Sequence, residues 1–198
     1  MKKYTMKVKM WISTIKNILI LKRIANLRTD ARLSMTQDEQ RLLTALVEKL
    51  EPSNLITRNG KITYKAPTLE DVTLWDMLET RRADGSVERI HAWTGGKYSP
   101  DTVTDCIKLD KYILERLKDA DSLEEMIFNQ PKGMEESESE SDPIREAKAL
   151  LGLVQVTSEL FQCSFDEAKK VNYTDAMLAM SKRMEEIEKE KAKIKNMK

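Results

Sequence analysis

The sequence is poor in the residues from which catalytic and cofactor sites are usually built. Its 198 residues include only six glycines, two cysteines and one histidine. Phosphate-binding loops are rich in glycine, so the small number of glycines argues against one, and Gly95-Gly96-Lys97 lacks the required spacing. Cys106 and Cys163 lie far apart, which argues against a disulfide framework or a cysteine metal site and favours a reducing compartment. We therefore expect no metal and no cofactor.

A long apolar run is also missing. The most apolar stretch, residues 12–21, contains Lys16 and is shorter than the ~20 apolar residues that cross a bilayer. It is not followed by a small-residue cleavage site of the secretory kind. The sequence thus predicts a protein without a membrane span that works inside a cell or is assembled there.

Candidate catalytic groups are few. His91 lies between Ile90 and Trp93 in a predicted strand, without a cysteine or acidic pair at metal-ligand spacing, so a structural role is favoured. Acidic residues that share one predicted helix more often form a solvated face than a catalytic pair; they are Glu70, Asp71, Asp76 and Glu79. We predict that the protein is not an enzyme, and keep an activity through His91 and neighbouring acids as a remote alternative.

Charge is abundant but unevenly placed. Residues 1–33 carry nine Lys or Arg against one Asp, a net of +8, so the rest of the chain carries −7 within the total of +1. This segment reads as a basic amphipathic arm. It is compatible with docking on a partner, with phosphate contacts to nucleic acid, with a membrane-surface helix, or with a helix packed on its own domain. The candidate partner-binding residues here are Trp11, Ile15, Leu19, Lys22 and Arg23.

The next part of the chain has clear local signals. Thr36 and Glu39 form a capping-box pattern ahead of an apolar helical stripe that Pro52 should end. Asn59-Gly60 between two β-rich runs predicts a hairpin near residues 55–65. Asp84-Gly85 is a second turn signal, and predicts a second hairpin or β-ribbon over residues 79–93.

Further helix starts are predicted between and after these turns. Thr68 is expected to cap a short helix containing Val72 and Trp75. Residues 99–101, Ser-Pro-Asp, should begin a longer helix, and Asp121-Ser122 should begin one more turn or two.

Residues 130–142 form a linker rich in Glu and Ser that cannot bury enough apolar surface to fold. Beyond it, Pro143, a capping box at Ser164 and Glu167, and Thr174 mark three helix starts. The apolar face of the first helix is expected to hold Ile144, Ala147, Leu151, Val154 and Phe161. Met177, Met180, Met184 and Ile187 then recur at heptad-like spacing, but Lys191 takes an expected apolar position, which favours a single helix over a coiled coil.

The sequence therefore predicts an α+β fold that is mainly helical. We divide it into a basic arm (1–33), a mixed α+β domain (34–129), an acidic flexible linker (130–142) and a helical C-terminal region (143–198).

The patterns of residues 60–71 and 159–168 resemble those of tail-assembly chaperones and related small assembly proteins of tailed phages. Residues 60–71, Gly-Lys-Ile-Thr-Tyr-Lys-Ala-Pro-Thr-Leu-Glu-Asp, look like a strand followed by the Pro-Thr-Leu-x-Asp helix start of such proteins. Residues 159–168, Glu-Leu-Phe-Gln-Cys-Ser-Phe-Asp-Glu-Ala, with Tyr173-Thr174-Asp175, are similar to their C-terminal ending. The quoted residues cover about an eighth of the chain, and the basic arm and acidic linker depart from the pattern. The resemblance implies no catalytic residue.

Our leading hypothesis is a non-enzymatic phage structural or assembly protein of the tail or head-tail region, found in the host cytoplasm or the virion. It would dock helical faces on other phage structural proteins or on copies of itself. The alternative is a nucleic-acid-binding regulator that uses residues 1–33. The candidate partner-binding residues in the C-terminal region are Leu151, Val154, Phe161, Met177 and Met180.

Overall fold

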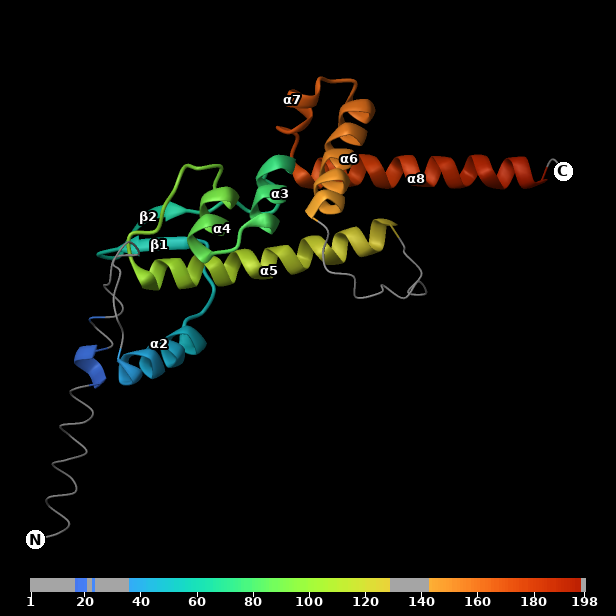
Figure 1. Cartoon of the computed structure of the whole chain (residues 1–198). Helices are drawn as coiled ribbons and strands as arrows, with labels where there is room; N and C mark the ends of the chain where they lie inside the picture. Colours follow the sequence, from blue (N-terminus) through green and yellow to red (C-terminus); the bar gives the residue numbers. More distant parts are fainter. Residues whose placement is uncertain (1–16, 21–22, 24–35, 129–142, 197–198) are drawn as a thin grey trace, which may run out of the picture.

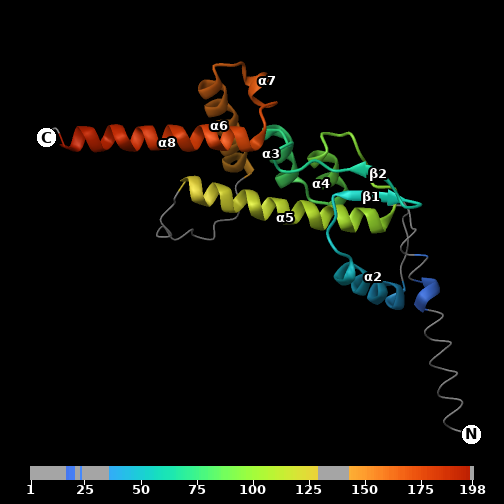
Figure 2. The same cartoon turned by 180° about the vertical axis from the view of Figure 1, so that it is seen from behind.

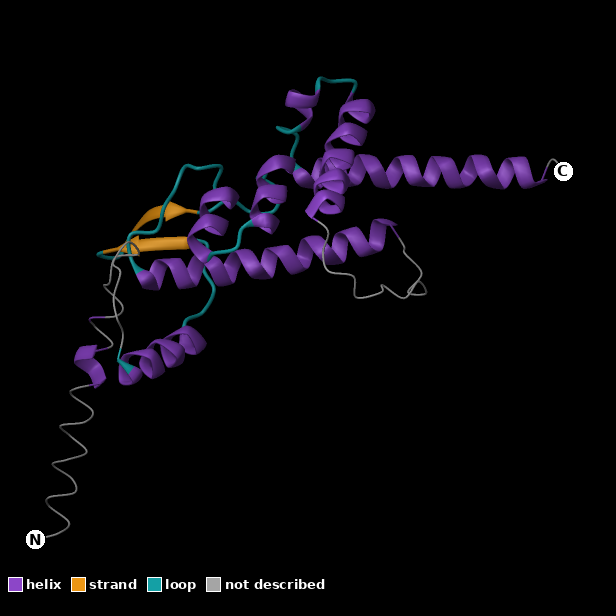
Figure 3. Cartoon of the chain, in the orientation of Figure 1, coloured by secondary structure: helices purple, strands orange, loops and turns teal. Residues whose placement is uncertain are grey.

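The structure, a computed structural model, describes residues 17–20, 23, 36–128 and 143–196. These residues are mostly helical, and one small β-hairpin lies at one end of the body (Figure 3). The prediction of a mainly helical α+β fold is therefore confirmed. Most of the predicted basic arm and all of the predicted linker lie outside the described residues.

The first long helix and the hairpin form as their local signals require. Helix α2 (Gln37–Lys49) begins with the capping box, in which the Thr36 hydroxyl accepts from the Glu39 amide at 3.3 Å and the Glu39 carboxylate accepts from the Thr36 amide at 2.9 Å. Strands β1 (Leu55–Arg58) and β2 (Lys61–Lys65) pair antiparallel across Asn59 and Gly60, whose φ angles are 50° and 75°. Both φ angles lie in the left-handed region that a tight hairpin turn needs. The Arg58 guanidinium binds Asp105, which ties the hairpin to the body.

The body is built on one long helix, α5 (Val103–Phe128), against which α4 (Ser86–Trp93) packs (Figure 1). Helix α3 (Leu74–Arg82) packs on α4 and reaches α5 through the Arg81 side chain. Trp93 is fully buried, and its indole nitrogen donates to the Pro67 carbonyl at 3.0 Å. Tyr64 of β2 and Tyr98 stack with ring centroids 3.8 Å apart, which closes the core beside the hairpin.

The C-terminal helices are α6 (Pro143–Phe161), α7 (Phe165–Ala168) and α8 (Tyr173–Asn196). They share one hydrophobic core with the body, because Val154, Ala168, Tyr173, Ala176 and Met177 are buried together with residues of α3 and α5. Backbone contacts add to this joint. The Leu74 amide donates to the Val171 carbonyl at 2.8 Å, and the Tyr173 amide donates to the Val72 carbonyl at 2.9 Å. Beyond this joint, α8 extends away from the body (Figures 1 and 2).

Three local predictions are wrong. No strand follows Asp84-Gly85; Ser86–Trp93 is helix α4, since its buried residues Ile90 and Trp93 recur at helical spacing. His91 accordingly lies in a helix. Asp121-Ser122 begins nothing, because the Ser122 hydroxyl donates to the Lys118 carbonyl and α5 continues through both residues.

Three helix starts are displaced from their predicted positions. Thr68 binds Asp71 in a single turn, and Thr73 caps α3 instead, accepting from the Asp76 amide at 3.1 Å. Helix α5 begins after Thr102, whose hydroxyl accepts from the Asp105 amide. Helix α8 begins at Tyr173, one residue before the predicted cap.

Candidate partner-binding surface on the C-terminal helices

The candidate partner-binding residues fall into three groups in the structure. Val154, Met177 and Met180 are buried, so in the folded chain they belong to the core rather than to a docking surface. Leu151, Phe161 and Leu19 are exposed, and Arg23 is exposed and forms an ion pair with Glu39 at 3.4 Å. The others lie outside the described residues; they are Trp11, Ile15 and Lys22.

The face of α6 that packs on the core differs from the apolar face expected from the sequence. Val154 and Thr157 are fully buried, and Leu153 and Leu160 pack against the core at their side. Leu151 points away from this face. The Thr157 hydroxyl donates to the Leu153 carbonyl at 2.9 Å, which satisfies this buried polar group. The side chains of Ile144 and Ala147 are not among those described.

An apolar groove lies where the last turns of α5 meet the first turns of α8. Its volume is about 440 Å³, and it is lined by Leu123, Met126, Ile127, Thr174, Leu178 and Ser181. Met126 is 74 % exposed and Leu178 is 55 % exposed, whereas side chains of this kind are usually covered. We call this feature the α5–α8 groove. It is concave, apolar and open to solvent, which is the surface that an apolar side chain or a helix of a partner can fill.

The walls of the groove are held in place by a partly buried polar network. The Tyr173 hydroxyl donates to Glu124 at 2.6 Å, and the Arg81 guanidinium binds both oxygens of the same carboxylate at 3.0 and 3.1 Å. Arg81 also binds Asp121 at 2.8 Å. Burial, followed by the hydrogen bond and charge of Glu124, raises the pKa of Tyr173, so this hydroxyl stays a neutral donor. The network joins α3, α5 and α8, and therefore fixes the distance between the two sides of the groove.

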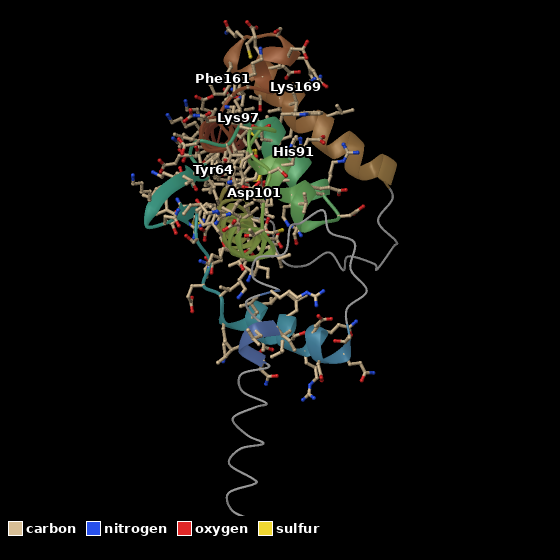
Figure 4. The ribbon with its side chains drawn as sticks, turned by 90° about the vertical axis from the view of Figure 1, so that its left-hand side faces the viewer. Tyr64, His91, Lys97, Asp101, Phe161 and Lys169 are labelled. Atoms are coloured by element: carbon tan, nitrogen blue, oxygen red, sulfur yellow. The ribbon has the colours of Figure 1, made fainter. Side chains whose placement is uncertain are left out.

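A second exposed apolar region lies at the end formed by α6 and α7. Figure 4 shows Phe161 and Lys169 there, near the top of the view and above Tyr64. The Lys169 ammonium lies 4.8 Å from the Trp75 ring centroid and 5.0 Å from that of Phe165. These distances allow a cation–π interaction with both rings, which holds α7 against α3. Phe161 and Phe165 remain partly exposed beside it.

The remote enzymatic alternative can be compared with an open cleft between α3 and α4. The cleft has a volume of about 510 Å³ and brings His91 near the acids of both helices; its lining includes Asp76, Glu79, Glu88, Gly95 and Gly96. The His91 ring packs at Gly96, where a Cβ would meet it at 3.3 Å. Within the part of the chain that is described, no hydrogen bond joins this ring to a carboxylate.

Over residues 36–128 and 143–196, no cluster of three or more metal-ligating side chains occurs. No helix in those ranges has the length and apolar character to cross a membrane. No protein-family model matches the chain, and neither a curated protein nor a solved structure matches it.

The residues that line the α5–α8 groove were not recognised from the sequence. Leu123, Met126 and Ile127 read as the end of an amphipathic helix, and Leu178 as one apolar residue beside a heptad stripe. About fifty residues separate the two walls, so no local pattern brings them together. The one usable signal was that Leu178 lies off the Met177 and Met180 stripe.

Proposed function

We propose that this chain is a non-enzymatic assembly protein that docks on other polypeptides through its C-terminal helices. The observation that carries the proposal is the α5–α8 groove, where Met126 and Leu178 remain exposed around a concave apolar surface. Covering such side chains gains roughly 1.5–3 kcal/mol each when burial is complete. A partner side chain seated in the groove would supply that cover.

The surrounding architecture supports docking rather than turnover. The groove walls are fixed by the Arg81, Glu124 and Tyr173 network, so the surface is organised before a partner arrives. Phe161 and Phe165 add exposed aromatic area at the other end of the C-terminal helices, and aromatic side chains are enriched at protein interfaces. With the resemblance of residues 60–71 and 159–168 to tailed-phage assembly proteins, the best-supported partners are other phage structural proteins, in the host cytoplasm or the virion.

The test is to compare captured proteins between matched variants of the full chain. Leu178→Glu and Met126→Glu place a charge in the groove, and Lys182→Glu makes a similar change on an exposed position of α8. We expect both groove variants to lose a partner that the wild type and Lys182→Glu retain. That partner should then bind the purified wild type, and bind the groove variants at least tenfold more weakly, by calorimetry. Equal binding by all the proteins would refute docking at this groove.

The nucleic-acid alternative predicts a different result. Binding through phosphates must weaken steeply as salt rises, and it should depend on residues 1–33 rather than on Leu178. Fluorescence anisotropy with labelled DNA and RNA at several salt concentrations separates the two functions.

A further inference from the structure

The apolar stripe of α8 continues past the body of the protein. Tyr173, Met177 and Met180 recur at steps of four and three residues and are buried against α5 and α6. The same steps lead to Met184, Ile187, Lys191 and Ile194. Here the cover becomes thinner: Met180 is 4 % exposed, Met184 is 39 % exposed, Ile187 is partly covered and Ile194 is 60 % exposed. In heptad terms Met177, Met184 and Lys191 are a positions, and Met180, Ile187 and Ile194 are d positions.

We propose that residues 184–194 of α8 pair with the same residues of a second copy of this chain, as a short antiparallel coiled coil. In an antiparallel pair, a positions meet d positions across the seam. Met184 would then pack on the partner's Ile194, and Ile187 on the partner's Lys191. The segment is self-complementary in this alignment, because the same pairs recur on the other side of the two-fold axis.

One pair of opposite charges near the axis fits this alignment, and it has to outweigh the repulsion between Glu190 and the partner's Glu190, which the alignment brings together at the g positions. Lys191 and Glu188 lie on the same flank of the seam, because Lys191 is an a position and Glu188 is the e position three residues before it. The alignment places Lys191 beside the partner's Glu188, and Glu188 beside the partner's Lys191. Neither side chain has an ion-pair partner within the described part of its own chain. Lys191, which interrupts the apolar seam, thus gains an acidic partner, while its aliphatic stem covers Ile187 of the other copy.

The body of each copy decides the direction of pairing. A parallel pair would also match some charges, such as Arg183 with the partner's Glu188. However, the two helices of a parallel pair lie about 8–10 Å apart along their whole shared face. The start of the second α8 would then occupy the space where α5 and α6 already pack on Tyr173, Met177 and Met180. In the antiparallel pair the two bodies lie at opposite ends and do not overlap.

The interface is small, about two heptads, so the dimer should be weak. We expect self-association at concentrations on the order of 10–100 µM. Sedimentation equilibrium of the full chain measures it directly. The variant Ile187→Glu/Ile194→Glu should be monomeric, with unchanged thermal unfolding because both positions lie outside the core. The control Ala192→Glu/Asn196→Asp adds the same charge away from the seam and should dimerise as the wild type does. A wild type that stays monomeric up to about 1 mM would overturn the proposal.

Direction is tested by cross-linking in a Cys163→Ser background. Chains carrying Met184→Cys should form a disulfide with chains carrying Ile194→Cys when the two are mixed, and neither should cross-link alone. Cross-linking of each variant with itself would indicate a parallel pair and contradict the proposal. Mixing Lys191→Glu with Glu188→Lys should likewise restore the dimer that each variant loses alone. All of these variants leave the α5–α8 groove intact, so partner binding there and self-association through α8 can succeed or fail separately.

Discussion

The two halves of α8 follow one apolar pattern and have opposite surroundings. Residues 173–180 place their stripe in the core, where Tyr173 and Met177 are fully buried. Residues 184–194 place the same stripe in solvent beyond the body. A heptad pattern therefore establishes that a stripe exists, while the rest of the chain determines what covers it. Here α5 and α6 cover the first half and end before the second.

The two halves also differ in how their polar groups are used. At the body end, Tyr173 donates to Glu124, which is held by Arg81 from a different helix. At the distal end, the ion pairs join residues of the same helix, such as Arg183 with Glu186 and Lys189 with Glu185. The first set fixes tertiary structure. The second set supports only local helix, and leaves the seam free for a partner.

The largest expected effect is a difference in stability between the same substitution made in each half of α8. Met177→Ala removes a fully buried side chain and should lower the free energy of unfolding by about 2–5 kcal/mol. Met184→Ala removes a partly exposed one, and should lower it by less than about 1 kcal/mol. Urea denaturation of both variants at a concentration well below that of self-association measures the difference. Equal losses would mean that the body covers more of α8 than its exposure indicates.

A pH titration of stability tests one charged group of the body, the Asp105 carboxylate. The buried Asp105 carboxylate loses solvation, but the bonds from Arg58 and then from Thr102 outweigh that loss and lower its pKa. A lowered folded pKa adds stability above the unfolded pKa of about 3.9, and this stability is lost as pH falls through the folded pKa. We expect Asp105→Asn to lower the stability at pH 7 by about 1–3 kcal/mol.

The same variant should also lose less stability than the wild type between about pH 5 and pH 2. Denaturation midpoints across this range give the two slopes. An identical acid response in both proteins would show that Asp105 does not contribute to it.

Tyr173→Phe isolates the hydrogen bond at the joint from the burial of the ring. The phenyl ring fills the same space, and Glu124 keeps its two contacts with Arg81. The loss should therefore be that of one hydrogen bond to a carboxylate, about 1–2 kcal/mol. Thermal unfolding of Tyr173→Phe beside Tyr112→Phe, which removes a hydroxyl bound to the Pro67 carbonyl at 3.2 Å, separates this bond from the general cost of losing a tyrosine hydroxyl.

The sequence correctly predicted the elements that are determined by a few neighbouring residues. Both capping boxes, at Thr36 and at Ser164, form as expected, and so does the hairpin at Asn59-Gly60. The strand prediction after Asp84-Gly85 was wrong because the same dipeptide can also join two helices. The helix was indicated by the residues that follow it, since the buried residues Ile90 and Trp93 are three apart.

The docking surface was harder to predict because it is tertiary. Three of the residues singled out for binding, Val154, Met177 and Met180, are buried in the core, whereas Leu151 and Phe161 are exposed. The groove instead uses Met126 and Leu178, which lie beside the regular stripes and meet only when α5 and α8 pack. A sequence pattern can rank residues by amphipathicity, but the packing of distant helices decides which of them remain uncovered.

The smallest expected effect concerns the surface charges of the distal half. Glu185 and Lys189 form an i,i+4 pair at 3.7 Å with both side chains well exposed. Exposed pairs of this spacing contribute about 0.3–0.5 kcal/mol or less, since water and salt screen them. Glu185→Gln should therefore leave unfolding within error of the wild type and reduce the helical circular dichroism signal only slightly. If it instead weakened dimerisation as strongly as Ile187→Glu/Ile194→Glu, the contact between copies would involve the outer face of α8, and the seam proposed above would be the wrong one.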